Sequence, residues 1–574
     1  MRNIFFKLLV YFIGINGLFY FNSCNNPDKS LNSGNDEILR LYDGVEFKMD
    51  IIKPPIFPNY KVKITDFGAK GDSLTLNTEA INKAIENVSN KGGGKVIIPA
   101  GIWLTGPIKL KSNVNLHLEK GALLIFSGNF DDYPIIQTSF EGLNTYRCTS
   151  PISAFNETNI AITGEGIIDG SGDAWRPVKK SKLTESQWKK LINSGGFVDE
   201  KNGIWYPSEK SYKGSRISNM NVPVNLKTKE EHEEIKDFLR PVMVSLVQCK
   251  NILLEGVTFQ NSPAWNLHPL MCENIILRNL TIRNPWYSQN GDGLDLESCK
   301  NALIYDCNFD VGDDAICIKS GKDADGRKRN IPTENVIIKN CVVYHGHGGF
   351  VVGSEMSGGV RNIHVSNCTF IGTDAGLRFK TTRGRGGIVE KIYISNIRMV
   401  NIETEPIRFN MYYGGEAPEA GDGKKIKREE IAKVPVTEET PQFREIYMKN
   451  IYSINSYRAI ALRGLPEMNI KKIYIENALI KAKNGVEIYE ADSLVFKNVN
   501  IIVDNNLNPL MYCYNIKNTE FDGFKFEYKS NDFPIVIEGN ETTNIIFNKK
   551  DFESFEKQVK FMDGNLKDII KLKQ

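Results

Sequence analysis

A short segment recurs along most of the chain and constrains its fold more than any other feature. Each copy has a brief β-branched run, a small polar residue and a second short run. The copies begin at Asn251, Asn274, Asn301, Asn335, Asn362, Lys391, Glu445, Lys472 and Ser493, mostly 21 to 34 residues apart. Self-similarity at this period is typical of solenoids, in which each repeat packs only on its neighbours.

The repeats alternate apolar and other residues with a period of two, which indicates strands and excludes helices. The sixth residue of most repeats is Asn, at positions 279, 340, 367, 396, 450, 477 and 498. Asn tolerates a left-handed bend, and stacked Asn side chains can hydrogen-bond from one rung to the next. The pattern predicts an all-β, right-handed parallel β-helix. It disfavours an up-and-down barrel because hairpin turn pairs are scarce.

Most of the ten cysteines fall at repeat positions. One column holds Cys249, Cys272 and Cys299, and another follows the bend at residues 307, 341 and 368. Small buried side chains explain this placement better than disulfides or a metal, and no CxxC pair suggests zinc.

The rest of the chain supplies a cap, insertions and a tail around a β-helical catalytic domain at 61–545. A helical stripe within 75–99, formed by Ala80, Ile81, Ala84, Ile85 and Val88, predicts an N-terminal capping helix. The insertion at 172–240 is interpreted as a flap over one end of a groove or as surface decoration. A second, charged insertion lies near 414–438, and 546–574 is expected to be a C-terminal tail.

Residues 1–24 have the pattern of an export signal, with Arg2 and Lys7 around an apolar run. Cys24 resembles the lipid-attachment cysteine of bacterial lipoproteins, and 25–60 would be a tether. The expectation is an exported protein, periplasmic or anchored to the outer membrane by a lipid, alternatively secreted. The net charge of +3 is too small to indicate a general binder of nucleic acid.

Four consecutive repeats start their final strand with polar residues, in the sequences NGDGLDLES, VGDDAICIKS, HGHGGFVVGS and TDAGLRFKT. Aligning them puts Asp292 over Asp314 and Asp313 over His347, with rungs about 4.8 Å apart. The same register turns Arg378 and Lys380 outward, beside the carboxylates. A set of exposed ion pairs stabilises a fold little, so the cluster indicates function.

Two chemistries fit this cluster. Glycoside hydrolysis needs a protonated acid and a carboxylate base, whose pKa values separate when like charges are crowded. Alternatively, the aspartates could hold calcium while Arg378 or Lys380 abstracts a proton in a β-elimination. A solvated acidic end of the rungs is the remaining, non-functional interpretation.

The motifs Asn290-Gly291-Asp292, Gly312-Asp313-Asp314, Gly346-His347-Gly348 and Arg378-Phe379-Lys380 occur in this order. With "TDFGAKGD" near the N-terminus, they make the chain resemble the polygalacturonase type of glycoside hydrolase family 28, over roughly residues 63–500. Gly291 departs from the Thr that many members carry.

The resemblance implies an inverting hydrolase without cofactor or metal, in which Asp313 is the acid and Asp292 with Asp314 activates water. Inversion implies carboxyls about 6.5 to 9.5 Å apart. His347 would tune the acid. Arg378, Lys380, Asn290 and Tyr412 would contact the sugar, with Tyr413 as the alternative to Tyr412.

The implied substrate is a pectic polysaccharide or oligogalacturonide, cleaved at α-1,4 linkages, with exo action favoured by the insertion. The chain is expected to be a monomer. Three alternatives stay open: a calcium-dependent pectate lyase, a rhamnogalacturonan hydrolase and a non-catalytic carbohydrate-binding solenoid. His268 and Trp286 either line the groove or pack in the core.

Overall fold

The computed structural model describes residues 37–218, 221–415, 431–504, 509–528, 535–556, 559–561 and 569–574. The chain divides into two compact units, Met1–Gly44 and Val45–Gln574. The described part of the first unit holds one helical turn at residues 37–41, and the second carries the whole strand ladder. The predicted signal segment, Cys24 and most of the charged insertion at 414–438 lie outside the described residues. Within the described ranges, no helix is both long and apolar enough to cross a membrane.

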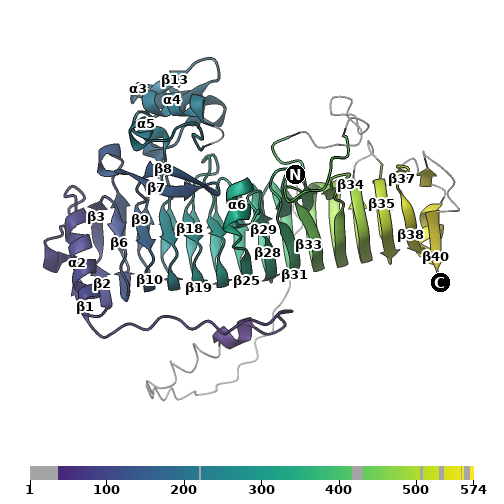
Figure 1. Cartoon of the computed structure of the whole chain (residues 1–574), viewed down its shortest axis with the longest axis horizontal. Coiled ribbons are helices and arrows are strands. Elements are labelled where there is room, and N and C mark those ends of the chain that lie inside the picture. The colour runs from purple at the N-terminus through teal and green to yellow at the C-terminus, as the bar shows by residue number, and fades with distance from the viewer. Residues whose placement is uncertain are drawn as a thin grey trace, which may run out of the picture. The chain divides into compact units, whose positions relative to one another are not determined.

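The second unit is the expected right-handed parallel β-helix, whose rungs stack along its long axis (Figure 1). Three parallel faces enclose one apolar core. The first face consists of β1 (Lys61–Lys63), β2 (Gly94–Ile98), β5 (Val114–Leu118), β10 (Thr158–Gly164), β16 (Lys250–Glu255), β19 (Glu273–Arg278), β22 (Lys300–Tyr305), β25 (Thr333–Lys339), β28 (Val360–Ser366), β31 (Ile388–Ile402), β33 (Gln442–Arg463), β34 (Ile470–Val503), β35 (Met511–Asp522), β38 (Thr543–Asn548) and β40 (Ile570–Lys573).

The second face is shorter in most rungs. It consists of β3 (Gly101–Thr105), β6 (Ala122–Phe126), β11 (Ile167–Asp169), β17 (Thr258–Gln260), β20 (Thr281–Arg283), β23 (Asn308–Asp310), β26 (Val342–Tyr344), β29 (Thr369–Ile371) and β36 (Lys525–Tyr528). The long strands β31, β33 and β34 turn the corner and continue this face in the later rungs.

The third face carries the polar motifs. It consists of β4 (Ile108–Lys109), β9 (Ile152–Phe155), β15 (Val244–Val247), β18 (Leu267–Leu270), β21 (Leu294–Glu297), β24 (Asp314–Lys319), β27 (Gly348–Val352), β30 (Ala375–Lys380), β32 (Ile407–Asn410), β37 (Ile535–Glu538) and β39 (Val559–Phe561). Parts of β33, β34 and β35 complete it between β32 and β37.

The predicted inward residues of the third face are all buried. Each is at most 1% exposed and belongs to the single core between the faces: Leu294, Leu296, Ile316, Ile318, Phe350, Val352, Leu377 and Phe379. Each such side chain contributes roughly 1.5–3 kcal/mol by leaving water. The cysteines of the repeat columns are buried and unpaired, as predicted.

Asparagine ladders hold successive bends together. Asn396 donates to Asn367 (3.1 Å) and Asn450 to Asn396 (2.8 Å), and the ladder continues through Asn477 and Asn498. These residues have φ between 53° and 56°, the left-handed conformation that the sequence predicts. A second ladder, which the sequence analysis did not identify, links the first residues of the repeats from Asn159 and Asn251 to Asn362.

The helix α2 (Thr78–Asn90) covers the first rungs at one end of the ladder (Figure 1). Its predicted stripe packs on the core, with Ile81, Ala84, Ile85 and Val88 fully buried. The expected capping helix is therefore present.

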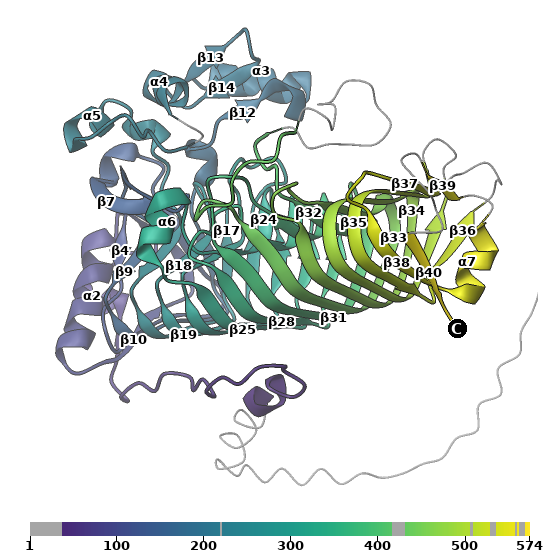
Figure 2. The ribbon, with the colours of Figure 1, turned by 45° about the vertical axis from the view of Figure 1, so that its right-hand side comes forward.

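The insertion at 172–240 stands beside the ladder on the side of an antiparallel hairpin (Figures 1 and 2). The hairpin is β7 (Ile135–Phe140) with β8 (Leu143–Cys148). The insertion contains a small sheet and short helices: β12 (Val178–Lys179), β13 (Phe197–Asp199), β14 (Ile204–Tyr206), α3 (Glu185–Asn193), α4 (Glu209–Ile217) and α5 (Lys229–Glu233). Residues Ile235 and Phe238 pack against Ile135, which joins the insertion to the hairpin.

The ladder extends beyond residue 545, where the sequence analysis expected a tail. After α7 (Lys549–Phe555), β39 pairs with β37 and β40 with β38. One further helix, α6 (Asp323–Arg329), follows β24 on the third face. The single 3₁₀ turns are η1 (Ile64–Phe67), η2 (Phe130–Asp132), η3 (Gly172–Ala174), η4 (Lys180–Lys182) and η5 (Lys236–Phe238).

Candidate active site

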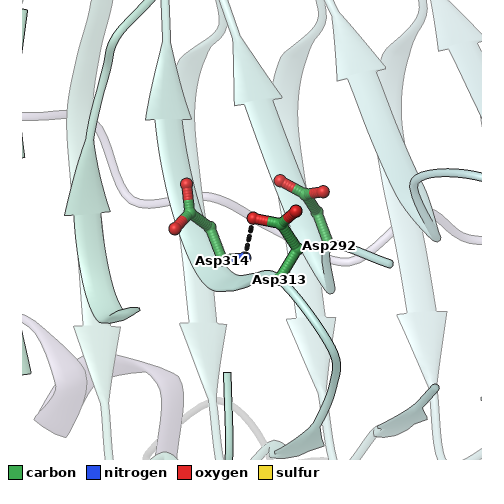
Figure 3. Close-up of side chains that lie close together, drawn as sticks. All are labelled: Asp292, Asp313 and Asp314. Atoms are coloured by element: carbon green, nitrogen blue, oxygen red, sulfur yellow. Dashed lines mark hydrogen bonds between the residues drawn. The ribbon is translucent and has the colours of Figure 1, made fainter. Parts of the chain in front are cut away.

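The strand register brings the predicted polar residues together at the start of the third face. Leu294 pairs with Ile316, and Asp314 pairs with Gly348. Asp292, Asp313 and Asp314 consequently lie on neighbouring rungs (Figure 3). One oxygen of each carboxylate lies within 4.8 Å of the others. This is closer than the 6.5–9.5 Å that the resemblance implied.

Asp314 is neutralised by two cations from two rungs further on. Arg378 Nη1 donates to Asp314 Oδ1 (3.1 Å) and Lys380 Nζ to Oδ2 (2.6 Å). Burial alone would raise the pKa of Asp314, but Lys380 and Arg378 outweigh it and hold the pKa well below its usual range. Asp314 is therefore a fixed anion with both oxygens occupied.

Asp313 is the most exposed of the three carboxylates, with 21% of its side chain accessible. Its Oδ1 accepts from the backbone N–H of Asp314 (3.0 Å) and lies 2.9 Å from His347 Nδ1. The hydrogen bond to Asp313 raises the pKa of His347, although burial opposes it. Asp313 is placed to meet a ligand, with the imidazole of His347 hydrogen-bonded behind it.

Asp292 is 3% exposed, and its Oδ1 is buried without a hydrogen-bond partner. Burial and then the charges of Asp313 and Asp295 raise the pKa of Asp292 well above its usual range. Asp292 therefore keeps its proton to a higher pH than an ordinary aspartate and becomes a stronger base once it is ionised.

A buried ionic layer lies under the carboxylates, and the sequence analysis did not identify it. Lys319 Nζ lies 2.8 Å from Glu355 Oε2, 3.5 Å from Asp295 Oδ1 and 4.8 Å from the ring centre of Trp265. Asp295 is fully buried, and neither of its oxygens accepts a hydrogen bond. The alternation that turned Leu294 and Leu296 inward could have placed Asp295 outward, in this layer.

Two adjacent tyrosines follow β32 and face different surroundings. The Tyr412 hydroxyl donates to the Gly464 carbonyl (2.9 Å), and its ring packs against the core. The Tyr413 ring centre lies 4.8 Å from Lys380 Nζ and 6.0 Å from the Arg378 guanidinium. The structure thus places Tyr413 beside the predicted sugar-binding cations. Tyr412 instead packs against the core of the β-helix.

Asn290 is held by a buried arginine at the end of the insertion. Arg240 Nη2 donates to Asn290 Oδ1 (2.8 Å), and Nη1 donates to the carbonyls of Pro263 and Gln289. Arg240 is 3% exposed. The clamp fixes the turn that leads to Asp292, because Arg240 joins Gln289 and Asn290 of this turn to Pro263 of the preceding rung.

The two residues whose role the sequence left open have opposite environments. His268 is buried, with Nε2 2.9 Å from Glu297 Oε2, so it is part of the packed interior and does not line the groove surface. Trp286 is exposed and lines a hollow next to the turns that carry the carboxylates.

Comparisons with known proteins show which families and chains this protein resembles. A family model described as glycosyl hydrolases family 28 matches residues 226–456, and one described as rhamnogalacturonase A/epimerase, pectate lyase-like matches residues 61–139. The chain is 29% identical over 437 residues to a probable polygalacturonase of Vitis vinifera, covering 73% of this chain and 74% of that one. It is 31% identical over 362 residues to the exo-poly-alpha-D-galacturonosidase of Dickeya chrysanthemi, covering 61% and 57%.

A solved structure extends the likeness over nearly its whole length. The crystal structure of a hyperthermoactive exopolygalacturonase from Thermotoga maritima superposes with a TM-score of 0.63 at 32% identity. The match covers 82% of this chain and 96% of that chain.

Proposed function

This chain belongs to glycoside hydrolase family 28, and we propose that it hydrolyses α-1,4-galacturonosidic bonds of pectin or oligogalacturonides, releasing units from chain ends. The observation that carries the proposal is that three carboxylates, an imidazole and two cations lie together on one surface. The activities named for the Dickeya and Thermotoga relatives support the substrate and the exo action.

The environments suit an acid and a base. Asp313 is exposed enough to protonate the leaving oxygen, and His347 orients it. Asp292 is the base that takes a proton from water, helped by the fixed charge of Asp314. In the substrate-free protein the surroundings favour a proton on Asp292, so that proton has to reach Asp313 before the reaction. One oxygen of each carboxylate lies within 4.8 Å of the other, which leaves room for one bridging water to carry this proton.

Inversion is proposed because water is the nucleophile that fits. Asp292 is too buried to meet a sugar carbon, and both oxygens of Asp314 are bound to cations. The close spacing alone would suggest retention, for which carboxyls lie about 5–5.5 Å apart. Proton NMR of the first product settles the point: inversion of an α-linkage yields the β-anomer first, and initial α-anomer would contradict it.

The cations are suited to an acidic sugar. The burial of Lys380 lowers its pKa, but Asp314 outweighs this and raises the pKa, and Arg378 behaves similarly. Both side chains therefore stay charged, which favours binding a uronate carboxylate. Arg378 keeps 16% of its side chain exposed and is the better placed of the two. Tyr413 and Asn290 complete the proposed sugar contacts.

Exo action has a structural basis on the N-terminal side of the site. The insertion reaches Asn290 through Arg240, and Asn221 donates to Glu141 at the hairpin tip (2.6 Å). The tip touches the turn before α6 so closely that a Cβ added to Gly142 would lie 2.6 Å from the Lys322 backbone nitrogen. The hairpin tip, the insertion and the turn before α6 are thus joined beside the third face, and this barrier is proposed to limit how far a sugar chain extends on that side.

A calcium-dependent lyase is a poorer fit. Calcium takes six to eight oxygen ligands, whereas both oxygens of Asp314 already accept from Lys380 and Arg378. The proposed base would also have to be Lys380 or Arg378, whose raised pKa values keep them protonated.

The decisive experiment incubates the protein with digalacturonate, polygalacturonate and rhamnogalacturonan in the presence of EDTA. The expected result is galacturonate released from the start, with no ultraviolet-absorbing unsaturated product. Loss of activity in EDTA with unsaturated products would identify a lyase, and cleavage of rhamnogalacturonan alone would change the substrate. Binding without turnover would leave a carbohydrate-binding solenoid.

Asp313→Asn tests the acid. It should lower kcat by roughly 10²–10⁴-fold, as expected for loss of a general acid, without changing the folded state in circular dichroism. An aryl galacturonide with a good leaving group should recover much of the rate in Asp313→Asn but not in Asp292→Asn, because only the former lacks the proton donor. Equal recovery in both variants would remove this assignment.

We also propose that the protein is exported as a monomer and anchored by lipid at Cys24. The support for export and the lipid anchor is the sequence pattern of residues 1–24 alone, and the monomeric state is an expectation for gel filtration to test. Palmitate labelling in a bacterial host should mark the wild-type protein and not Cys24→Ser, and gel filtration of the soluble variant should give the monomer mass.

A further inference from the structure

Trp286 stands apart from the other tryptophans of the chain. It is 55% exposed, whereas the other five are at most 7% exposed. Tyr287 packs edge-on against it, with ring centres 5.9 Å apart, and Lys182 of the insertion lies 4.3 Å from its ring centre. A large aromatic surface left in water near a catalytic site indicates a binding surface.

Trp286 lines a hollow of about 730 Å³ whose lining residues are mostly polar. Amide, guanidinium and imidazole groups surround it, from Gln260, Asn261, Arg283 and His345. Aromatic faces combined with such groups suit sugars, which have apolar faces and hydroxyl edges.

The hollow and the carboxylates share three consecutive turns. The turn after β20 carries Trp286 and then Asp292. The turn after β23 runs from Asp310, in the hollow, to Asp313, a span of at most about 11 Å. The turn after β26 carries His345 and then His347. The hollow thus begins within about 11 Å of Asp313, a distance of a few sugar units.

The hollow carries charges of both signs, negative from Asp169, Asp173 and Asp310 and positive from Arg176 and Arg283. Among the described residues, neither Arg283 nor Lys182 forms an ion pair with a carboxylate. The hollow also contains acids, but these are already bound: Asp169 accepts from Gln260 (2.8 Å), Asp173 accepts from Asn261 (2.8 Å), and Asp310 lies 3.0 Å from His345. Arg283 therefore remains for a ligand carboxylate, and Lys182 lies over the Trp286 ring at the edge of the hollow.

We propose that the hollow beside Trp286 is a second binding site, which holds the part of an acidic polysaccharide chain that extends beyond the sugars at Asp292 and Asp313. The indole stacks on a sugar face, and Arg283 and Lys182 meet uronate carboxylates. This proposal rests on the proposed function, since it concerns the same substrate.

Trp286→Ala tests it through chain length. The KM for polygalacturonate should rise by roughly tenfold, as for loss of an aromatic anchor. Digalacturonate is too short to fill both places, so its KM should change much less. Arg283→Gln should raise the polymer KM by a smaller factor that fades in high salt, because a charge contact is screened.

Phe155→Ala is the matched control. Phe155 is 67% exposed and lines a separate, larger hollow of about 1290 Å³ beside the hairpin and α6, which shares none of the three turns. The control should leave the polymer KM unchanged. An unchanged KM in Trp286→Ala, equal losses on short and long substrates, or a rise confined to Phe155→Ala would overturn the proposal.

A binding measurement separates this proposal from the proposed function. Calorimetry with Asp313→Asn, alone and combined with Trp286→Ala, measures polygalacturonate affinity without turnover. Weaker binding in the double variant supports the site even if the wild-type protein hydrolyses none of the substrates. Equal affinity, or no binding by either protein, overturns it.

Discussion

At the scale of single residues, Asp292 combines features that oppose folding. It is buried, one of its oxygens has no hydrogen-bond partner, and three neighbouring carboxylates repel its charge. The ionised form needed for hydrolysis is therefore the form that the folded protein disfavours. Such groups persist where chemistry requires them.

Asp292→Asn should raise the melting temperature at pH 7 by about 1–3 °C while abolishing activity. The folded pKa of Asp292 lies above its unfolded value, so ionisation destabilises the folded state increasingly as pH rises. The gain in the variant should therefore shrink toward pH 4. Calorimetric scans across this range measure it, and a lower melting temperature or a pH-independent gain would contradict it.

Substitutions of Lys319 and Glu355 should shift the pH dependence of kcat/KM in opposite directions. The part concerned is the acid limb, where the rate rises as Asp292 loses its proton. Lys319 lowers the pKa of Asp292 by its charge, and Glu355 balances Lys319 at 2.8 Å. Lys319→Met should move the limb up by about 1 pH unit, and Glu355→Gln should move it down. Asp295, Asp313, Asp314, Arg378, Lys380, Arg385 and His347 also face this region and stay unchanged.

Lys319→Arg is the control for that pair, because it keeps the charge. Its pH profile should remain close to that of the wild type. Shifts in the same direction for Lys319→Met and Glu355→Gln would mean that packing, rather than charge, governs the limb.

At the scale of elements, neighbouring rungs are joined by backbone hydrogen bonds between their strands. The asparagine ladders add side-chain hydrogen bonds between their bends. Asn450 donates to Asn396 (2.8 Å), accepts from Asn477 (3.3 Å) and has φ of 56°. It therefore carries two contributions to stability: hydrogen bonding and a tolerated left-handed backbone.

Substituting Asn450 should separate these contributions. Asn450→Gly keeps the backbone free and should lower the free energy of unfolding by about 1–2 kcal/mol, whereas Asn450→Ala adds left-handed strain of about 1–2 kcal/mol. Urea denaturation measures both. Equal losses would show that the backbone conformation contributes nothing.

The repeat pattern predicted the elements and much of the site for a definite reason. Each turn recurs once per rung, so one alignment fixed the inward residues and put Asp292 over Asp314. Contacts between segments outside the repeat were not predictable. The burial of His268 depends on Glu297 and Trp265, and the choice of Tyr413 over Tyr412 depends on a turn that occurs once.

At the scale of the whole molecule, the ladder has a first edge that has to be covered. Exposed strand edges pair with other chains, and α2 prevents this by burying Ile81, Ile85 and Val88 against the core. The cap is therefore expected to keep the protein soluble as well as folded.

Ile85→Asp should uncover that edge and produce soluble oligomers or aggregates. A buried charge would detach the helix at the cost of several kcal/mol. Light scattering after gel filtration measures the change, with Lys83→Asp on the exposed side of α2 as control. A monomeric Ile85→Asp protein would show that the cap is dispensable.

The reacting groups occupy only the rungs from β21 to β30, while equivalent rungs continue on both sides. Whole rungs could therefore be gained or lost beyond Asn410 without altering the distance from Asp292 to Lys380. The number of rungs and the catalytic geometry are therefore independent in such a molecule. A new domain could be inserted at the C-terminal end of the ladder without changing the reaction.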